Sequence, residues 1–139
     1  MGVIISSVLA LDVGGKRVGL ALASLVARLP SPFMTLTYDD NFFAALTKII
    51  RSENVSQLVV GLPRGLEGQA TSQTAEVKAF VEELRRQVSV PIDLQDEAVT
   101  SKQAEAELVA RGKNYAKTDI DSLAANYILQ DWLAENKVK

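Results

Sequence analysis

The chain has 139 residues, of which 47% are hydrophobic and 23% are charged, and its formal net charge is −2. These values predict one domain spanning residues 1–139, with enough apolar side chains for a core. The sequence contains no cysteine and no histidine, which excludes disulfides, zinc sites built on those residues, Ser-His-Asp triads and imidazole bases. Any catalysis must therefore use carboxylates, hydroxyls, Lys, Arg, Tyr or a bound ion.

The first residues, Met1–Ser7, lack the cationic start and the cleavage site of a secretory signal. No apolar run approaches the roughly 20 residues that a membrane helix needs, so we expect a cytoplasmic protein without a membrane partner. With a net charge of −2, the surface as a whole does not attract nucleic acid. A nucleic-acid partner would need a local basic patch or metal ions bound to acidic groups.

An apolar run at Val8–Leu11 ends in Asp12, and a second apolar run at Val18–Ala23 follows after two glycines and two cations. Both runs have the length of buried strands, and the Gly14-Gly15 pair between them predicts a hairpin. Asp12 would then lie at the carboxyl end of a strand, where its side chain could hold a metal ion or meet a phosphate. It could equally be an ordinary turn residue, since Asp favours turns.

The rest of the chain alternates between strand and helix patterns. Apolar spacing and turn residues predict a third strand at Leu29–Tyr38, a helix at Phe42–Asn54, a buried strand at Gln57–Leu62, a helix at Thr71–Gln87, a short strand at Val90–Leu94 and helices at Thr100–Ala110 and Thr118–Glu135. Short links between the first strands favour an antiparallel meander, and the later crossovers favour parallel pairing. We expect an α/β fold with a mixed five-stranded sheet, helices on both faces and a frayed tail at residues 136–139.

Three carboxylates have sequence positions from which they could converge. In open α/β sheets, ligands bind beyond the carboxyl ends of the strands; Asp12 ends the first predicted strand and Glu97 follows the fifth. Asp121 shares a helical face with Ala125 and Ile128, so we expect its carboxylate to point toward the sheet. An inward-facing acid is costly unless it is paired or bound to an ion.

Each acid also has a structural explanation. Asp121 could close a capping box with Thr118 or interact with the dipole at a helix N-terminus. Glu97, or Asp96 beside it, could cap the helix that starts near Thr100. If the three acids converge, they form an all-oxygen site suited to Mg²⁺ or Mn²⁺. Two such ions roughly 4 Å apart can activate a water and stabilise the leaving oxygen in phosphodiester hydrolysis.

Cations and aromatic residues outside this set have two interpretations each. Arg64, in the loop after the central strand, could clamp a phosphate or be an ordinary solvated residue. The loop before Asp121 could guide nucleic acid or simply be solvated, and Tyr115 within it could stack on an unpaired base; its cations are Arg111, Lys113 and Lys117. Trp132 fits a core or an interface position better than a functional one.

Four sequence blocks carry a family resemblance. They are residues 11–19 (LDVGGKRVG), residues 59–63 (VVGLP) with Gly68, the pair Asp96-Glu97, and residues 121–125 (DSLAA) with Ile128-Leu129. In order and spacing they resemble the signature blocks of the YqgF family, also called RuvX, whose members are described as Holliday junction resolvases or as pre-16S rRNA nucleases. The resemblance runs from about Leu9 to Leu133, which is nearly the whole chain.

The resemblance implies an RNase H-like fold, divalent-metal nuclease chemistry and a role in maturing the 5′ end of the small-subunit rRNA. Carried over by position, the metal-binding and catalytic acids are Asp12, Glu97 and Asp121, and the residues that meet substrate phosphate are Lys16 and Arg17. The family has an Arg directly after the Asp-Glu pair, and here Ala98 stands in its place. The hydroxyls that follow, Thr100 and Ser101, remain as substrate contacts.

Other functions remain open on the sequence alone. A resolvase acting on four-way DNA is the variant of the same chemistry. The Asp-x-Gly hairpin also occurs in phosphotransferases of the actin and sugar-kinase type, but those enzymes need two such domains. A non-catalytic RNA-binding protein that assists ribosome assembly would not need all three acids. Partners would be precursor rRNA or branched DNA, and ribosomal particles. The sequence fits a monomer or a homodimer, because no stretch identifies a dimer surface.

Overall fold

The computed structural model describes residues 5–65, 67–97, 100–112 and 114–136. In chain order the elements are β1 (Ser7–Val13), β2 (Arg17–Ser24), β3 (Ser31–Thr37), α1 (Phe42–Ser52), β4 (Val55–Pro63), α2 (Ser72–Gln87), β5 (Ile92–Glu97), α3 (Thr100–Ala110) and α4 (Lys117–Glu135). Every predicted strand and helix is present, with ends that differ from the prediction by up to three residues.

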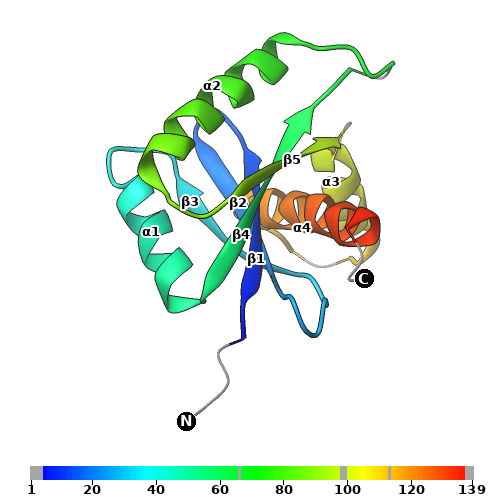
Figure 1. Ribbon diagram of the computed structural model, residues 1–139. Coiled ribbons are helices and arrows are strands. Elements are labelled where there is room, and N and C mark those ends of the chain that lie inside the picture. Colours follow the sequence, from blue (N-terminus) through cyan, green and yellow to red (C-terminus); the bar gives the residue numbers. More distant parts are fainter. Residues whose placement is uncertain (1–4, 66, 98–99, 113, 137–139) are drawn as a thin grey trace.

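The five strands form one mixed sheet in the order β3-β2-β1-β4-β5. β1 pairs antiparallel with β2, and β2 with β3, which is the predicted meander. β1 pairs parallel with β4, and β4 with β5, through the helical crossovers. The predicted mixed α/β sheet is therefore confirmed, with β1 at its centre (Figure 1).

Helices cover both faces of the sheet. α1 and α2 lie on one side, and α3 and α4 lie on the other (Figure 1). Along β1, Leu9 and Leu11 belong to the core under α1 and α2, whereas Val8 and Ala10 belong to the core under α4. Side chains alternate between the two faces of a strand, so Asp12 is on the α4 face. The prediction of helices on both faces is confirmed.

The fifth strand ends later than its apolar residues predict. β5 was expected at Val90–Leu94 and instead spans Ile92–Glu97. The reason is its partner: β4 continues to Pro63, and the parallel ladder pairs Pro63 with Glu97. Backbone pairing thus carries a polar sequence into the sheet, and Glu97 is the last residue of the strand rather than a residue of the following loop.

Within the parts of the chain that the structure describes, no helix is long and apolar enough to cross a membrane. α4 is the longest helix, and its buried residues include Ala125, Ile128 and Leu129. It packs against β1, β2 and β3 on one side and against α3 on the other.

Candidate active site

The N-terminal end of α4 lies directly on β2 because residue 19 has no side chain. A Cβ at Gly19 would come within 2.0 Å of the backbone carbonyl oxygen of Asp121. Gly19 is also the residue of β2 that pairs with Asp12 on β1. This close approach therefore brings the backbone of Asp121 next to the strand position of Asp12.

A second glycine allows α4 to stay close to the sheet further along. A Cβ at Gly61 on β4 would come within 2.3 Å of the Cδ1 atom of Ile128. The two glycines lie under successive parts of the same helix. They set how deeply α4 can pack, and hence where the side chains of its first turns can reach.

Asp12 is partly buried, and its environment disfavours its negative charge. Burial, and secondly the negative charge of Asp121, raise the pKa of Asp12 from 3.8 to about 6. Two carboxylates that sense each other in this way favour a proton or a cation between them. In the structure, two of the three predicted acids, Asp12 and Asp121, therefore lie close enough for the charge of one to raise the pKa of the other.

Arg17 forms an ion pair with Asp121. Its Nε donates to the Oδ2 of Asp121 across 2.6 Å, in a pair that joins the start of β2 to the first turns of α4. The predicted role of Arg17 was a contact to substrate phosphate. That role stays a prediction, and in the structure the guanidinium pairs with Asp121, one of the two neighbouring acids.

The capping interpretation of Asp121 does not match the geometry. The helix begins at Lys117, and the acid that accepts a hydrogen bond from the first free backbone N–H group is Asp119, which binds Ala116 N across 2.8 Å. Asp121 lies two residues further on, and its carboxylate is held by Arg17 instead. The predicted capping box with Thr118 is therefore not formed.

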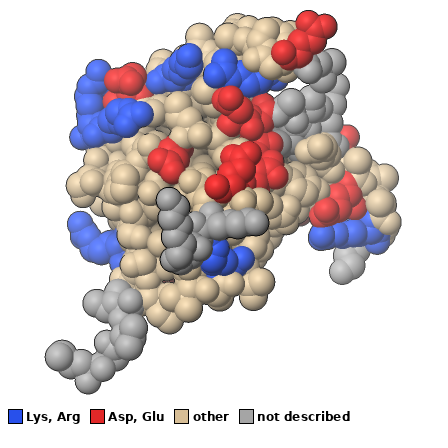
Figure 2. All heavy atoms as spheres, turned by 45° about the vertical axis from the view of Figure 1, so that its right-hand side comes forward, with Lys and Arg blue, Asp and Glu red and all other residues tan. Residues whose placement is uncertain are grey.

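Glu97 lies in a strongly acidic environment at the end of β5. Its Oε1 is buried and has no hydrogen-bond partner among the described residues. Burial raises the pKa of Glu97 to about 9, with further contributions from Asp131, Glu135 and, last, Asp12. Figure 2 shows acidic side chains gathered on the face where β5 and the C-terminal half of α4 lie. Glu97 thus faces mainly the acids of α4, and Asp12 is its weakest charged neighbour.

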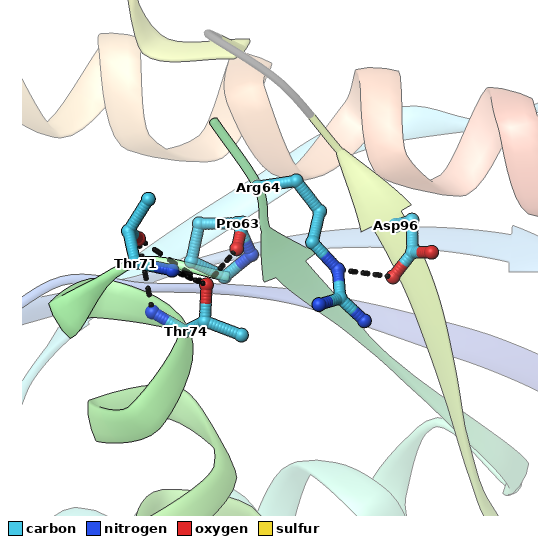
Figure 3. A network of polar contacts seen from close by, with 5 residues as sticks. All are labelled: Pro63, Arg64, Thr71, Thr74 and Asp96. Atoms are coloured by element: carbon cyan, nitrogen blue, oxygen red, sulfur yellow. Dashed lines mark hydrogen bonds and ion pairs between the residues drawn. The ribbon is translucent and has the colours of Figure 1, made fainter. Parts of the chain in front are cut away.

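The loop after β4 is tied to the same end of the sheet. The Nε of Arg64 donates to the Oδ1 of Asp96 across 3.2 Å, and its backbone N–H donates to the carbonyl oxygen of Glu97 across 2.9 Å. On the other side of the loop, the hydroxyl of Thr74 donates to the carbonyl oxygen of Pro63 (Figure 3). Arg64 therefore links the loop to β5 beside Glu97.

The residues present are of the kind that binds a hard divalent cation, although the described acids do not form a complete coordination site. Among the described residues, no group of three or more Asp, Glu, His or Cys side chains is close enough to hold a metal ion. The donor set is nevertheless all oxygen, with two mutually repelling carboxylates at Asp12 and Asp121 and a buried, unpartnered oxygen on Glu97. Acids that repel each other or lack a hydrogen-bond partner are what Mg²⁺ or Mn²⁺ would balance, beyond the charge that Arg17 supplies to Asp121.

The other predicted contacts are only partly described. Lys16 is exposed in the hairpin loop, and Tyr115 is exposed before α4. Arg111, directly after α3, pairs with Glu107 of that helix. Trp132 is buried and donates from Nε1 to Asp93, which confirms its predicted core position. The remaining predictions lie outside the described residues or side chains; they concern Ala98, Thr100, Ser101 and Lys113.

Two contributors to this region were missed by the sequence interpretation. Asp131 is one, and an acidic spacing of four residues between Asp131 and Glu135 on one helix was the available signal. Gly19 is the other; its role depends on which helix crosses β2, and no local pattern reports that. Asp131 helps to raise the pKa of Glu97, and Gly19 lets Asp121 lie close to β2. Neither residue adds a new kind of catalytic group.

The fold defines the class of this protein as RNase H-like, with the sheet order and two-sided helices described above. RuvC of T. thermophilus, solved in complex with a Holliday junction substrate, matches with a TM-score of 0.51 at 15% identity, over 94% of this chain and 95% of that chain. Fowlpox virus resolvase, solved with Holliday junction DNA, matches with a TM-score of 0.52 at 10% identity, over 91% and 99%. At these identities the likeness concerns the fold alone.

The chain belongs to the RuvX family, whose model, described as Holliday junction resolvase, matches residues 6–135. A protein of Maridesulfovibrio salexigens named "Putative pre-16S rRNA nuclease" is 41% identical over 131 residues, which cover 91% of this chain and 97% of that protein. A protein of the same name from Chloroflexus aurantiacus is 36% identical over 130 residues, or 91% of this chain and 85% of its own length. The resemblance seen in the four sequence blocks is confirmed.

Proposed function

We propose that this protein is a divalent-metal-dependent nuclease that hydrolyses phosphodiester bonds in structured RNA and processes the 5′ end of pre-16S rRNA in the cytoplasm. The observation that carries the proposal is the pair Asp12 and Asp121, two neighbouring acids near the end of β1, of which Asp121 is placed there by the packing of α4 on β2. The names of the relatives in the RuvX family supply the substrate.

All three acids would act as metal ligands. Asp12 and Asp121 would bind the cation, and Glu97 would have to move toward them to become the third ligand, because the described acids do not form a group of three. Mg²⁺ or Mn²⁺, as two ions, would supply an activated water and stabilise the leaving oxygen. Without metal, burial and the acids of α4 favour a proton on the carboxyl group of Glu97, because they raise its pKa to about 9. Binding as a ligand therefore requires that this proton leave its carboxyl group.

The cations would position the substrate. Lys16 is exposed at the tip of the hairpin that begins beyond Asp12, and Arg17 follows it at the start of β2. Both can approach a phosphate that lies over Asp12. Thr100 and Ser101, whose side chains are outside the described part of the structure, stay predicted substrate contacts, and Arg64 would reach a more distant phosphate from its loop.

A second candidate function is the cleavage of four-way DNA junctions. It is favoured by the description of the family model and by the fold shared with two proteins solved with junction DNA. The chemistry and the acids would be the same, and the substrates differ in sugar and in branching. A resolvase would also need a symmetric pair of sites to cut two strands together.

The test is a cleavage assay with end-labelled substrates. Purified protein is incubated with Mg²⁺ or Mn²⁺ and either a precursor fragment that contains the 5′ end of 16S rRNA or a synthetic four-way DNA junction. We expect cleavage of the precursor fragment that stops in EDTA and falls by at least about 10²-fold in Asp12→Asn, since one ligand is lost.

The matched control is Asp40→Asn, which makes the same chemical change at an exposed turn position between β3 and α1. It should cleave like the wild-type protein. Preferred cleavage of the junction would select the second candidate. Cleavage that persists undiminished in Asp12→Asn or in EDTA would contradict the proposed chemistry altogether.

A further inference from the structure

The ion pair between Arg17 and Asp121 bears directly on how a metal could bind. The carboxylate oxygen that Arg17 holds, Oδ2 of Asp121, belongs to a proposed metal ligand. Both partners remain accessible, with 36% of the Arg17 side chain and 19% of the Asp121 side chain exposed. A partly exposed pair can exchange its partner for one from solution, because water can replace each lost contact.

We propose that Arg17 and the divalent ion compete for Asp121, and that a substrate phosphate, by binding Arg17, frees Asp121 for the metal. Arg17 is then a positioning residue that couples substrate binding to metal loading. This inference rests on the proposed function, since it concerns the same acids, and it names a step that controls when they bind a cation.

Charge is the first argument. Asp121 carries a negative charge beside the strand position of Asp12, because its backbone packs on Gly19, the residue of β2 that pairs with Asp12. Arg17 neutralises part of that charge while it is bound. If the guanidinium swings away, two adjacent carboxylates are left without a counter-ion, and their joint attraction for a divalent ion increases.

The second argument is that only the side chain needs to move. The carbonyl oxygen of Arg17 accepts a hydrogen bond from Gly14 N across 2.9 Å, and Arg17 pairs with Thr37 of β3 in the ladder. Its backbone is therefore fixed on both sides. The backbone of Asp121 packs directly on Gly19, which leaves no room for a Cβ between them. Exchange thus requires a change of rotamer at Arg17 and no rearrangement of the sheet or of α4.

Guanidinium chemistry explains why phosphate is the natural competitor. Arg binds phosphate and carboxylate with the same fork of N–H donors, and phosphate offers it more acceptor oxygens. A phosphate bound there would also lie next to the freed Asp121. Metal and substrate would then bind cooperatively, each favouring the state that the other requires.

The neighbouring residue provides a matched control. Lys16 carries the same charge in the same hairpin, is exposed, and within the described part of the chain forms no ion pair. Removing either cation changes the net charge equally. Only the removal of Arg17 takes away the group that holds Asp121.

The first measurement is a calorimetric titration with Mn²⁺ in the absence of nucleic acid. Wild-type protein, Arg17→Met, Lys16→Met and Asp12→Asn are compared, and circular dichroism checks that each is folded. We expect Arg17→Met to bind Mn²⁺ about tenfold more tightly than wild-type protein, and Lys16→Met to stay within about twofold of it. Asp12→Asn should lose the binding. Arg17→Lys should lie between Arg17→Met and wild-type protein.

The second measurement repeats the titration with a short phosphorothioate RNA that resists hydrolysis. This RNA should tighten Mn²⁺ binding to wild-type protein and should have little effect on Mn²⁺ binding to Arg17→Met, in which Asp121 is already free. Equal Mn²⁺ affinities for wild-type protein and Arg17→Met, or equal tightening of both by the RNA, would overturn the inference and leave the nuclease proposal standing. Absence of Mn²⁺ binding in every protein would overturn the metal-dependent function itself.

Discussion

At neutral pH the ionised carboxyl group of Asp12 destabilises the metal-free protein. Its folded-state pKa of about 6 lies above the ordinary value of 3.8 because it is partly buried beside Asp121. The folded protein therefore holds this proton more tightly than the unfolded chain does. The corresponding stability is fully present below the unfolded value and is lost as the pH rises through the folded value of about 6.

Replacing Asp12 by Asn removes this charge and keeps the shape of the side chain. We expect Asp12→Asn without metal to be more stable than wild-type protein at about pH 8 by on the order of 1–2 kcal/mol. The gain should shrink as the pH falls through the range in which the wild-type carboxyl group becomes protonated. Urea unfolding in EDTA at several pH values measures both effects.

Asp40→Asn serves again as the control, since its exposed carboxyl group should give no such gain. A variant of Asp12 that is less stable than wild-type protein at about pH 8, or a gain that does not change with pH, would show that the acid is not under strain. Residues of a binding site often lower the stability of the protein while no ligand is bound.

At the scale of elements, the contact between β2 and α4 decides where Asp121 lies. The helix can approach the strand closely only because Gly19 lacks a Cβ, which would otherwise meet the backbone of Asp121 at 2.0 Å. A backbone atom cannot move aside as a side-chain tip can. The whole N-terminal end of α4 would have to shift to admit even a methyl group.

We therefore expect Gly19→Ala to lower the free energy of unfolding by about 2–3 kcal/mol and to weaken Mn²⁺ binding by displacing Asp121. Gly15→Ala is the matched control in the same hairpin. A Cβ at Gly15 meets nothing within 4 Å, and its φ is not in the left-handed region. Its effect on stability should stay within about 0.5 kcal/mol. Equal stability and equal Mn²⁺ affinity of the two variants would contradict this account of Gly19.

The elements themselves could be predicted because each is encoded by its own residues. The two apolar runs around Gly14-Gly15 and the apolar face of α4 are local patterns, and both appear where they were expected. The end of β5 was predicted too early, because its last residues are polar and belong to the strand through pairing with β4. The residues of one strand do not reveal how long the neighbouring strand is.

At the scale of the whole molecule, residues far apart in the sequence meet at one edge of the sheet. Arg17 and Asp121 are 104 positions apart, and their ion pair could not be read from either segment. The sequence did identify Asp12 and Asp121 as acids that face the same region. It did not predict that an arginine would pair with one of them, or that Asp131 and Glu135 would raise the pKa of Glu97 more than Asp12 does.

The central claim is that Asp12 and Asp121 form the metal centre of this RuvX-family protein. The most direct test is anomalous diffraction from crystals of the wild-type protein grown with Mn²⁺ and the phosphorothioate RNA. We predict an anomalous peak that places a Mn²⁺ ion within bonding distance of carboxylate oxygens of both Asp12 and Asp121. The guanidinium of Arg17 should then bind an RNA phosphate. A peak found only beside Glu97 and Asp131, or no peak at Asp12 while Arg17 still holds Asp121, would contradict the claim.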